Sequence, residues 1–126
     1  MKRHEARQKA LQVLFQLDST ELAAKEAIGY VLEEQKSNTF FEQLVHGVIE
    51  HKEQIDVALV EKLEKWSLDR LPKIERTILR IAVYELLWTE DTPKRVIFNE
   101  AVELAKEFGD DESKKFVNGV LSKFEE

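Results

Sequence analysis

The stretch KIERTILRIAVYELLWT, residues 73–89, decides the fold class of this chain. It is the most apolar segment in the sequence and contains no glycine or proline. Pro72 stands directly before it and suits a helix start, because the first turn does not need the backbone N–H that proline lacks. We therefore predict a helix over about 73–89 and expect it to be the most buried of the chain.

Further amphipathic segments flank this helix on both sides. Low counts of glycine (4) and proline (2) favour long regular segments, and no strand pattern or internal repeat is present. Asp18 and Thr39 are expected to cap two of the helices, and Gly109 to end another. The remaining expected helices cover residues 3–17, 18–35, 39–51, 55–66, 94–108 and about 110–124.

These segments predict an all-α fold of about seven helices joined by short loops. A length of 126 residues fits one domain with a continuous core. The segment at 66–72 is the clearest boundary, so we expect an N-terminal helical subdomain of about 1–66 and a C-terminal one of about 67–126.

Composition excludes several classes of protein. The chain has 43% hydrophobic and 35% charged residues, a balance typical of a soluble globular domain. It has no cysteine, so it has no disulfide and no thiolate metal site. The apolar run at 77–88 carries Arg80 and Glu85 and is too short to span a bilayer, and no signal-peptide pattern is visible. We expect a cytoplasmic protein.

Catalytic and metal-binding patterns are missing. The three histidines are His4, His46 and His51, and the last two are five residues apart, which does not place them on one helix face. There is no glycine-rich phosphate loop, and the acidic pairs lie among polar residues. We expect no enzymatic activity, no catalytic residue, no metal site and no cofactor.

The opening of the chain is basic although the whole chain carries a net charge of -6. In the first ten residues only one acid, Glu5, opposes the cations, and His4 can add to them. Those cations are Lys2, Arg3, Arg7 and Lys9. They form either an ordinary solvated face or a set of phosphate contacts, and composition alone favours neither. Nucleic acid is the first candidate for the anion.

A second basic segment lies near the C-terminus. Lys114 and Lys115 precede Phe116, so two cations stand beside an aromatic ring. Such a set can bind a phosphate and stack on a base. The alternative is that Phe116 belongs to the core and the lysines are solvated.

Three polar residues inside helical segments have structural interpretations. Arg80 lies in the most apolar segment and is expected to pair with an acid such as Glu100, because a buried unpaired arginine is too costly to keep. Asn99 and Asn118 lie inside amphipathic segments, where asparagine is unfavourable. We expect each to hydrogen-bond across helices.

Taken together, three regions resemble the N-utilisation substance B (NusB) family of antitermination factors. They are ARQKALQVLF (6–15), IERTILRIAVYELL (74–87) and VIFNEAVELAK (96–106), the last followed by KFVNGVL (115–121). They occur in the order found in the family and extend over essentially the whole chain. The resemblance implies two small helical bundles packed together, and no catalysis.

The resemblance also implies partners and site residues. Family members bind boxA-type single-stranded RNA of ribosomal RNA operons together with the small-subunit ribosomal protein that acts as NusE, and they join the antitermination complex of RNA polymerase. The basic N-terminal helix of the family maps onto Lys2, Arg3, His4, Arg7 and Lys9. A position near the RNA surface maps onto Phe116, beside Lys114 and Lys115, and one near the ribosomal-protein surface maps onto Glu75.

Three alternatives remain open at the level of sequence. The chain can be an accessory of ribosomal RNA processing or methylation, since the same fold occurs at the N-terminus of some ribosomal RNA methyltransferases. It can be a structural helical protein without an RNA role. It can also be a homodimer that buries its basic helix. The absence of a cofactor-binding motif disfavours an intact methyltransferase.

Overall fold

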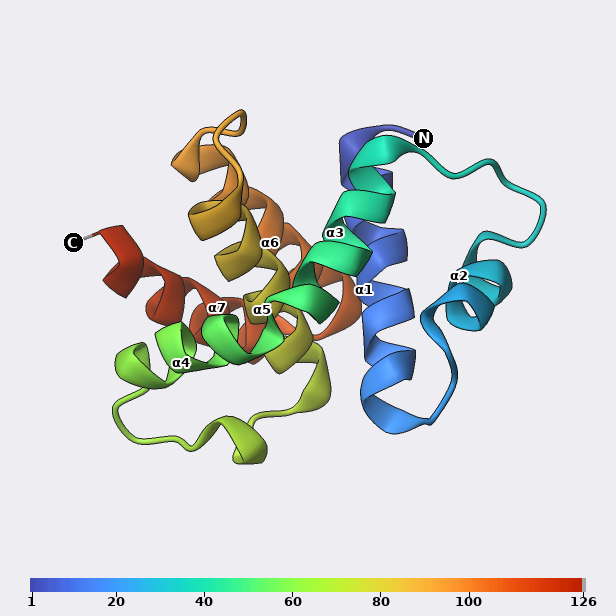
Figure 1. Cartoon of the computed structure of the whole chain (residues 1–126). Helices are drawn as coiled ribbons and strands as arrows, with labels where there is room; N and C mark the ends of the chain where they lie inside the picture. Colours follow the sequence, from blue (N-terminus) through green and yellow to red (C-terminus); the bar gives the residue numbers. More distant parts are fainter. Residues whose placement is uncertain (126) are drawn as a thin grey trace.

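A computed structural model describes residues 1–125 as helices joined by short connections, with no strand in that range (Figure 1). The all-α prediction and the expected number of helices are confirmed. Two short 3₁₀ helices, η1 (Leu68–Arg70) and η2 (Lys123–Glu125), accompany the α-helices. The α-helices are α1 (Arg3–Ser19), α2 (Ala24–Leu32), α3 (Thr39–Glu50), α4 (Lys52–Lys62), α5 (Lys73–Trp88), α6 (Lys94–Phe108) and α7 (Asp111–Ser122).

Helix α5 lies at the centre of the molecule and packs against α1, α3, α4, α6 and α7. All side chains from Thr77 to Glu85 are buried, which confirms the prediction for this segment. Its contact with α3 is close at Gly47, where an added Cβ would lie 2.2 Å from the ring of Tyr84. Glycine at this position therefore lets the two helices approach.

Two sets of helices share the core. Helix α1 packs against α2 and α3, whereas α6 packs against α5 and α7. Helix α4 packs mainly on α5, so it joins the second set although it precedes the connection at 63–72. In Figure 1, α1 and α2 lie at the right, and α4 and α7 lie together at the lower left. The division into subdomains at 66 and 67 stays a prediction.

Helix ends differ from the predictions in three places. Asp18 does not cap a helix at 18–35: it lies in the last turn of α1, where its carboxylate accepts a hydrogen bond from Arg76 at 2.6 Å, and α2 begins only at Ala24. Asn38, not Thr39, caps α3, because its side-chain oxygen accepts from the Phe41 N–H at 2.8 Å. Helix α4 covers Lys52–Lys62 rather than 55–66, with His51 as the joint to α3.

The helix boundaries predicted from proline and glycine are confirmed. Pro72 and Pro93 stand directly before the first residues of α5 and α6. Gly109 ends α6, and its N–H donates to the carbonyl of Ala105 at 2.9 Å. An added Cβ at Gly109 would lie 2.9 Å from that carbonyl oxygen and closer still to Ser113, so the turn into α7 is tight.

Candidate nucleic-acid interface

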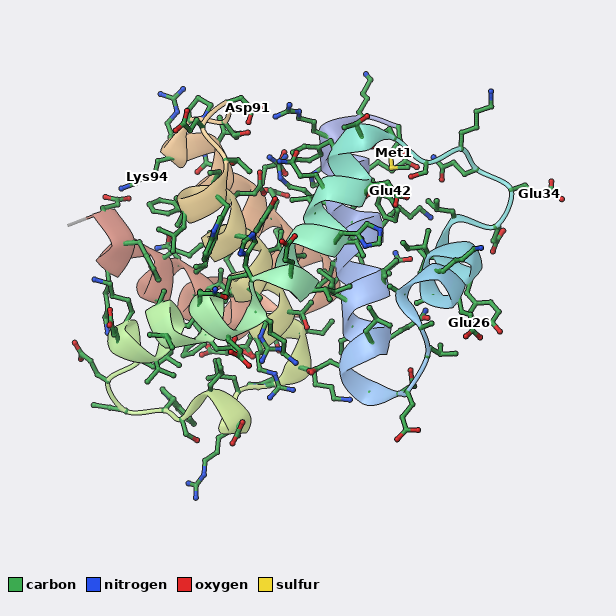
Figure 2. The ribbon with its side chains drawn as sticks, viewed as in Figure 1. Met1, Glu26, Glu34, Glu42, Asp91 and Lys94 are labelled. Carbon is green, nitrogen blue, oxygen red and sulfur yellow. The ribbon has the colours of Figure 1, made fainter. Side chains whose placement is uncertain are left out.

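Arg3 is the first residue of α1, and its guanidinium contacts the turn between α5 and α6. It donates to the Asp91 carboxylate at 2.9 Å and to the Thr92 hydroxyl at 3.0 Å. The same group lies 4.3 Å above the ring centre of Phe40 at the start of α3. Figure 2 shows Asp91 and Met1 at the same upper edge of the molecule. Half of the Arg3 side chain stays exposed, so it can still reach a phosphate.

Arg7 lies one turn further along α1 and points into the protein. Its side chain is 2% exposed and forms two parallel hydrogen bonds to Glu85 of α5, at 2.9 and 2.8 Å. A further guanidinium nitrogen lies 3.4 Å from a Glu100 oxygen of α6. The expectation that Arg7 faces solvent is wrong. It balances the charge of a buried carboxylate and offers no open edge to a phosphate.

His4 joins α1 to α6 on the neighbouring face. Its Nδ1 lies 2.6 Å from a Glu100 oxygen, and its Nε2 lies 3.2 Å from a Glu107 oxygen. The hydrogen bond to Glu100 raises the pKa of His4 above its ordinary value, with help from Glu107 and against the effect of burial. The imidazolium is therefore favoured, and two carboxylates hold it while 39% of its side chain stays exposed.

Lys2 and Lys9 complete the predicted basic set. Lys2 is exposed and Lys9 is half-buried, and neither forms an ion pair within residues 1–125. Acids of α5, α6 and the turn between them thus take up three of the five predicted groups. The positive end seen in the sequence is largely neutralised in the fold.

The second predicted set, on α7, has different surroundings. Lys114 and Lys115 are exposed, and neither has an acidic partner in the part of the chain that the structure describes. Phe116 is half-buried and meets Trp66 edge to face, with ring centres 6.4 Å apart and planes at 84°. Both rings line a groove of about 310 Å³ between α7 and the segment that follows α4.

Glu75 lies in the first turn of α5 and is half-buried. Burial raises the pKa of its carboxyl, and the negative charge of Asp110 before α7 adds to the effect. No ion pair of Glu75 occurs within the described chain. The carboxyl is thus available to a donor on a partner, as the family resemblance implies.

Three structural expectations about polar residues can be checked directly. Arg80 is buried and paired, as predicted, but its partners are Asp56 of α4 at 2.8 Å and Asp18 of α1 at 3.6 Å rather than Glu100. Arg80 faces α4, whereas Glu100 is engaged by α1. Asn99 and Asn118 are exposed and their side chains form no hydrogen bond within residues 1–125, so the prediction that they bond across helices is wrong.

Two surface residues at the groove were missed from the sequence. Trp66 is 55% exposed, and Lys65 precedes it on the open chain after α4. The pattern of a lysine directly before an aromatic residue is the same as at Lys115 and Phe116. The prediction of a helix over 55–66 gave these two residues no separate place, whereas α4 ends at Lys62 and leaves them in the connection that follows.

These features define a class of protein. Residues 1–125 contain no group of three or more side chains that could hold a metal ion. Within the same range, no helix is both long and apolar enough to cross a membrane. What the surface offers is cationic and aromatic side chains on an all-helical frame, a combination typical of nucleic-acid-binding proteins.

Comparison with known proteins names the family. The model of the NusB family matches residues 4–126. The chain is 66% identical to the transcription antitermination protein NusB of Lysinibacillus sphaericus, over 100% of this chain and 98% of that protein. It is 56% identical to the same protein of Bacillus subtilis, over 97% and 93% of the two chains. The chain therefore belongs to the NusB family.

A solved structure extends the comparison to the fold. The crystal structure of the antitermination factors NusB and NusE in complex with double-stranded RNA contains a chain that superposes with a TM-score of 0.84. That chain is 35% identical, and the match covers 98% of this chain and 96% of that one. The two-bundle architecture implied by the resemblance is thus confirmed.

Proposed function

We propose that this chain is a non-enzymatic RNA-binding adaptor of transcription antitermination. It binds boxA-type single-stranded RNA of ribosomal RNA operons together with the ribosomal protein that acts as NusE, and it works in the cytoplasm within the antitermination complex of RNA polymerase. The observation that carries this proposal is family membership over residues 4–126, supported by a related NusB seen with both NusE and RNA.

The RNA surface combines the cations of α1 and α7 that remain accessible. These are Arg3 and Lys9 on α1, Lys2 directly before it, and Lys114 and Lys115 on α7. Lysine supplies charge without the two-pronged geometry of arginine, so the contacts are directed at phosphates and depend strongly on salt. Phe116 adds a ring on which a base can stack.

Arg7 and His4 contribute to the same surface indirectly. Their bonds to Glu85, Glu100 and Glu107 hold α1 against α5 and α6 and so fix where Arg3 stands. Removal of either side chain is expected to disturb the placement of α1. It does not delete a phosphate contact.

The protein partner is attracted by the acidic remainder of the molecule. A chain with net charge -6 and a local basic face suits a basic ribosomal protein on one side and RNA on the other. In this proposal, Glu75 contacts the ribosomal protein. Each partner alone binds modestly, and the three-way complex is tighter because the two binding events favour each other by linkage.

A titration tests the proposal. Fluorescently labelled boxA-type RNA and a scrambled RNA of equal length are titrated with the protein, with and without NusE, at two salt concentrations. Tighter binding with NusE and preference for the boxA-type sequence are expected. Equal binding of both RNAs, or no binding even with NusE, contradicts the adaptor function and leaves a structural helical protein or an accessory of RNA processing.

Self-association is the remaining alternative for the basic helix. Light scattering at several protein concentrations separates a monomer from a homodimer that covers α1. Because Arg3 is half exposed and Lys2 is exposed in the single chain, we expect these residues to stay open to RNA.

A further inference from the structure

The groove between α7 and the segment after α4 has two aromatic walls. Trp66 is 55% exposed, and Phe116 meets it edge to face at 6.4 Å. A volume of about 310 Å³ is at the lower end of ligand sites, enough for one flat ring system but not for a docked helix. Trp66 is exposed and Phe116 is half-buried, so Trp66 offers the larger aromatic surface of the two.

Lysines surround these rings on both sides of the groove. Lys62 and Lys65 come from the end of α4 and its extension, and Lys115 and Lys123 come from α7 and η2. Glu64 is the one acid in the lining, and it is taken up by Lys123 at 3.3 Å. Lys65 and Lys115 have no ion pair within residues 1–125 and can each meet a phosphate.

The charge and the aromatic rings of the groove together indicate which class of ligand it binds. A basic or neutral peptide would gain nothing from a groove lined by four lysines and one glutamate, and an acidic peptide would satisfy the lysines without offering flat rings to Trp66 and Phe116. A single-stranded nucleic acid offers flat bases for the rings and phosphates at both sides of each base for the lysines. The two features therefore agree on one class of ligand.

We propose that Trp66 forms, with Phe116, a stacking subsite for one nucleotide of single-stranded RNA, with Lys65 and Lys115 contacting its flanking phosphates. The base stacks on the open face of Trp66, and the edge of Phe116 closes the other side. The proposal rests on the proposed RNA-binding function and extends its surface from α7 to the connection between α4 and α5.

Fluorescence gives a direct readout, because the chain has only two tryptophans. In a Trp88→Phe background, which keeps an aromatic ring next to His51, Trp66 is the sole emitter. Titration with the boxA-type RNA is expected to quench its emission, and the quench should follow the binding curve of labelled RNA. Binding of labelled RNA without any change in Trp66 emission contradicts the subsite.

Variants measure the contribution to affinity. Trp66→Ala is expected to weaken RNA binding about tenfold, since one base stacked on an aromatic ring commonly contributes that much. Trp66→Phe keeps a ring and should stay within about threefold of wild type. The matched control is Tyr30→Ala on α2, an aromatic side chain that is 64% exposed and stands outside the groove.

Two comparisons distinguish a failure of the proposed RNA-binding function from a failure of the stacking subsite. If the wild-type protein binds no RNA, the proposed function itself is wrong. If wild type binds RNA but Trp66→Ala and Tyr30→Ala both match it, only the subsite is wrong. Polyphosphate serves as a probe without bases: Trp66→Ala should leave its binding unchanged, and an equal loss for polyphosphate and RNA would show a loss of structure instead of stacking.

Discussion

The two cationic regions of this molecule differ in what faces them. At the start of α1, Arg3, His4 and Arg7 are matched by acids of α5, α6 and the turn between them. Lys65 and Lys115 line the groove beside α7 together with two aromatic rings, and they have no acidic partner in residues 1–125. The cations at the start of α1 therefore hold helices together, whereas the lysines of the groove remain available to an anion.

The buried pair between Arg7 and Glu85 should give the largest effect. Glu85→Ala leaves Arg7 buried without its main partner, and loss of one member of such a pair commonly costs about 3–5 kcal/mol. We expect the free energy of unfolding, measured by urea denaturation, to fall by that amount. The double variant Arg7→Met/Glu85→Leu should recover most of it, and a loss equal to that of Glu85→Ala would contradict the pairing argument.

The open lysines should control affinity instead of stability. Lys65→Ala/Lys115→Ala is expected to weaken binding of single-stranded RNA about tenfold. The slope of log affinity against log salt should become about 1.4 units shallower, because each lost phosphate contact on a single strand contributes about 0.7. The thermal midpoint should not change.

The matched control for these lysines removes two exposed charges elsewhere. Lys25→Ala/Lys36→Ala acts on α2 and the loop after it, on the side where Figure 2 labels Glu26 and Glu34. Its salt slope should equal that of wild type. If RNA affinity fell equally in both double variants, binding would depend on the net charge of the protein and not on the groove.

Removing the acidic partner of Arg3 would make the start of α1 resemble the groove beside α7, where the lysines face no acid. Asp91→Asn removes the negative charge that Arg3 contacts at 2.9 Å and leaves the half-exposed guanidinium without an acidic partner. RNA affinity at low salt is expected to rise about threefold, because a phosphate no longer competes with a carboxylate. Fluorescence anisotropy checks this, and Asp91→Asn in an Arg3→Ala background should show little of the gain.

The contact of His4 predicts a small dependence of stability on pH. Because Glu100 raises the pKa of His4 in the folded state, the stabilisation is complete below the unfolded value of 6.5 and is lost as pH rises through the higher folded value. Urea unfolding between pH 6 and pH 8 should therefore show stability falling more in wild type than in His4→Gln. Parallel curves would exclude a charged His4 contact.

Helix periodicity and the prolines were sufficient to predict most of the fold. Pro72 and Pro93 lie immediately before α5 and α6, and Gly109 ends α6, because these residues act through local backbone geometry. Asp18 was misplaced because an acid before a polar segment resembles a cap, whereas its carboxylate is bound by Arg76, 58 residues later. Sequence carries no local signal for such a partner.

The candidate site was predictable in residue type but not in exposure. Lys115 and Phe116, both candidates from the sequence, line the groove, whereas Lys114 is exposed outside its lining. Composition does not distinguish Arg7 from Arg3. The burial of Arg7 depends on its contacts with Glu85 and Glu100, which lie on other helices. Trp66 was missed because its role depends on contact with α7 across the groove.

RNA affinity of two variants tests the central claim most directly. Arg7→Met/Glu85→Leu removes a cation from α1, and Lys115→Ala removes one from α7. Both are compared with wild type in a boxA-type RNA titration, after urea unfolding has shown that they are folded. If paired cations fasten the fold and open ones bind RNA, the first variant keeps its affinity within about twofold while Lys115→Ala loses about fivefold. A larger loss in the first variant than in the second would contradict this account.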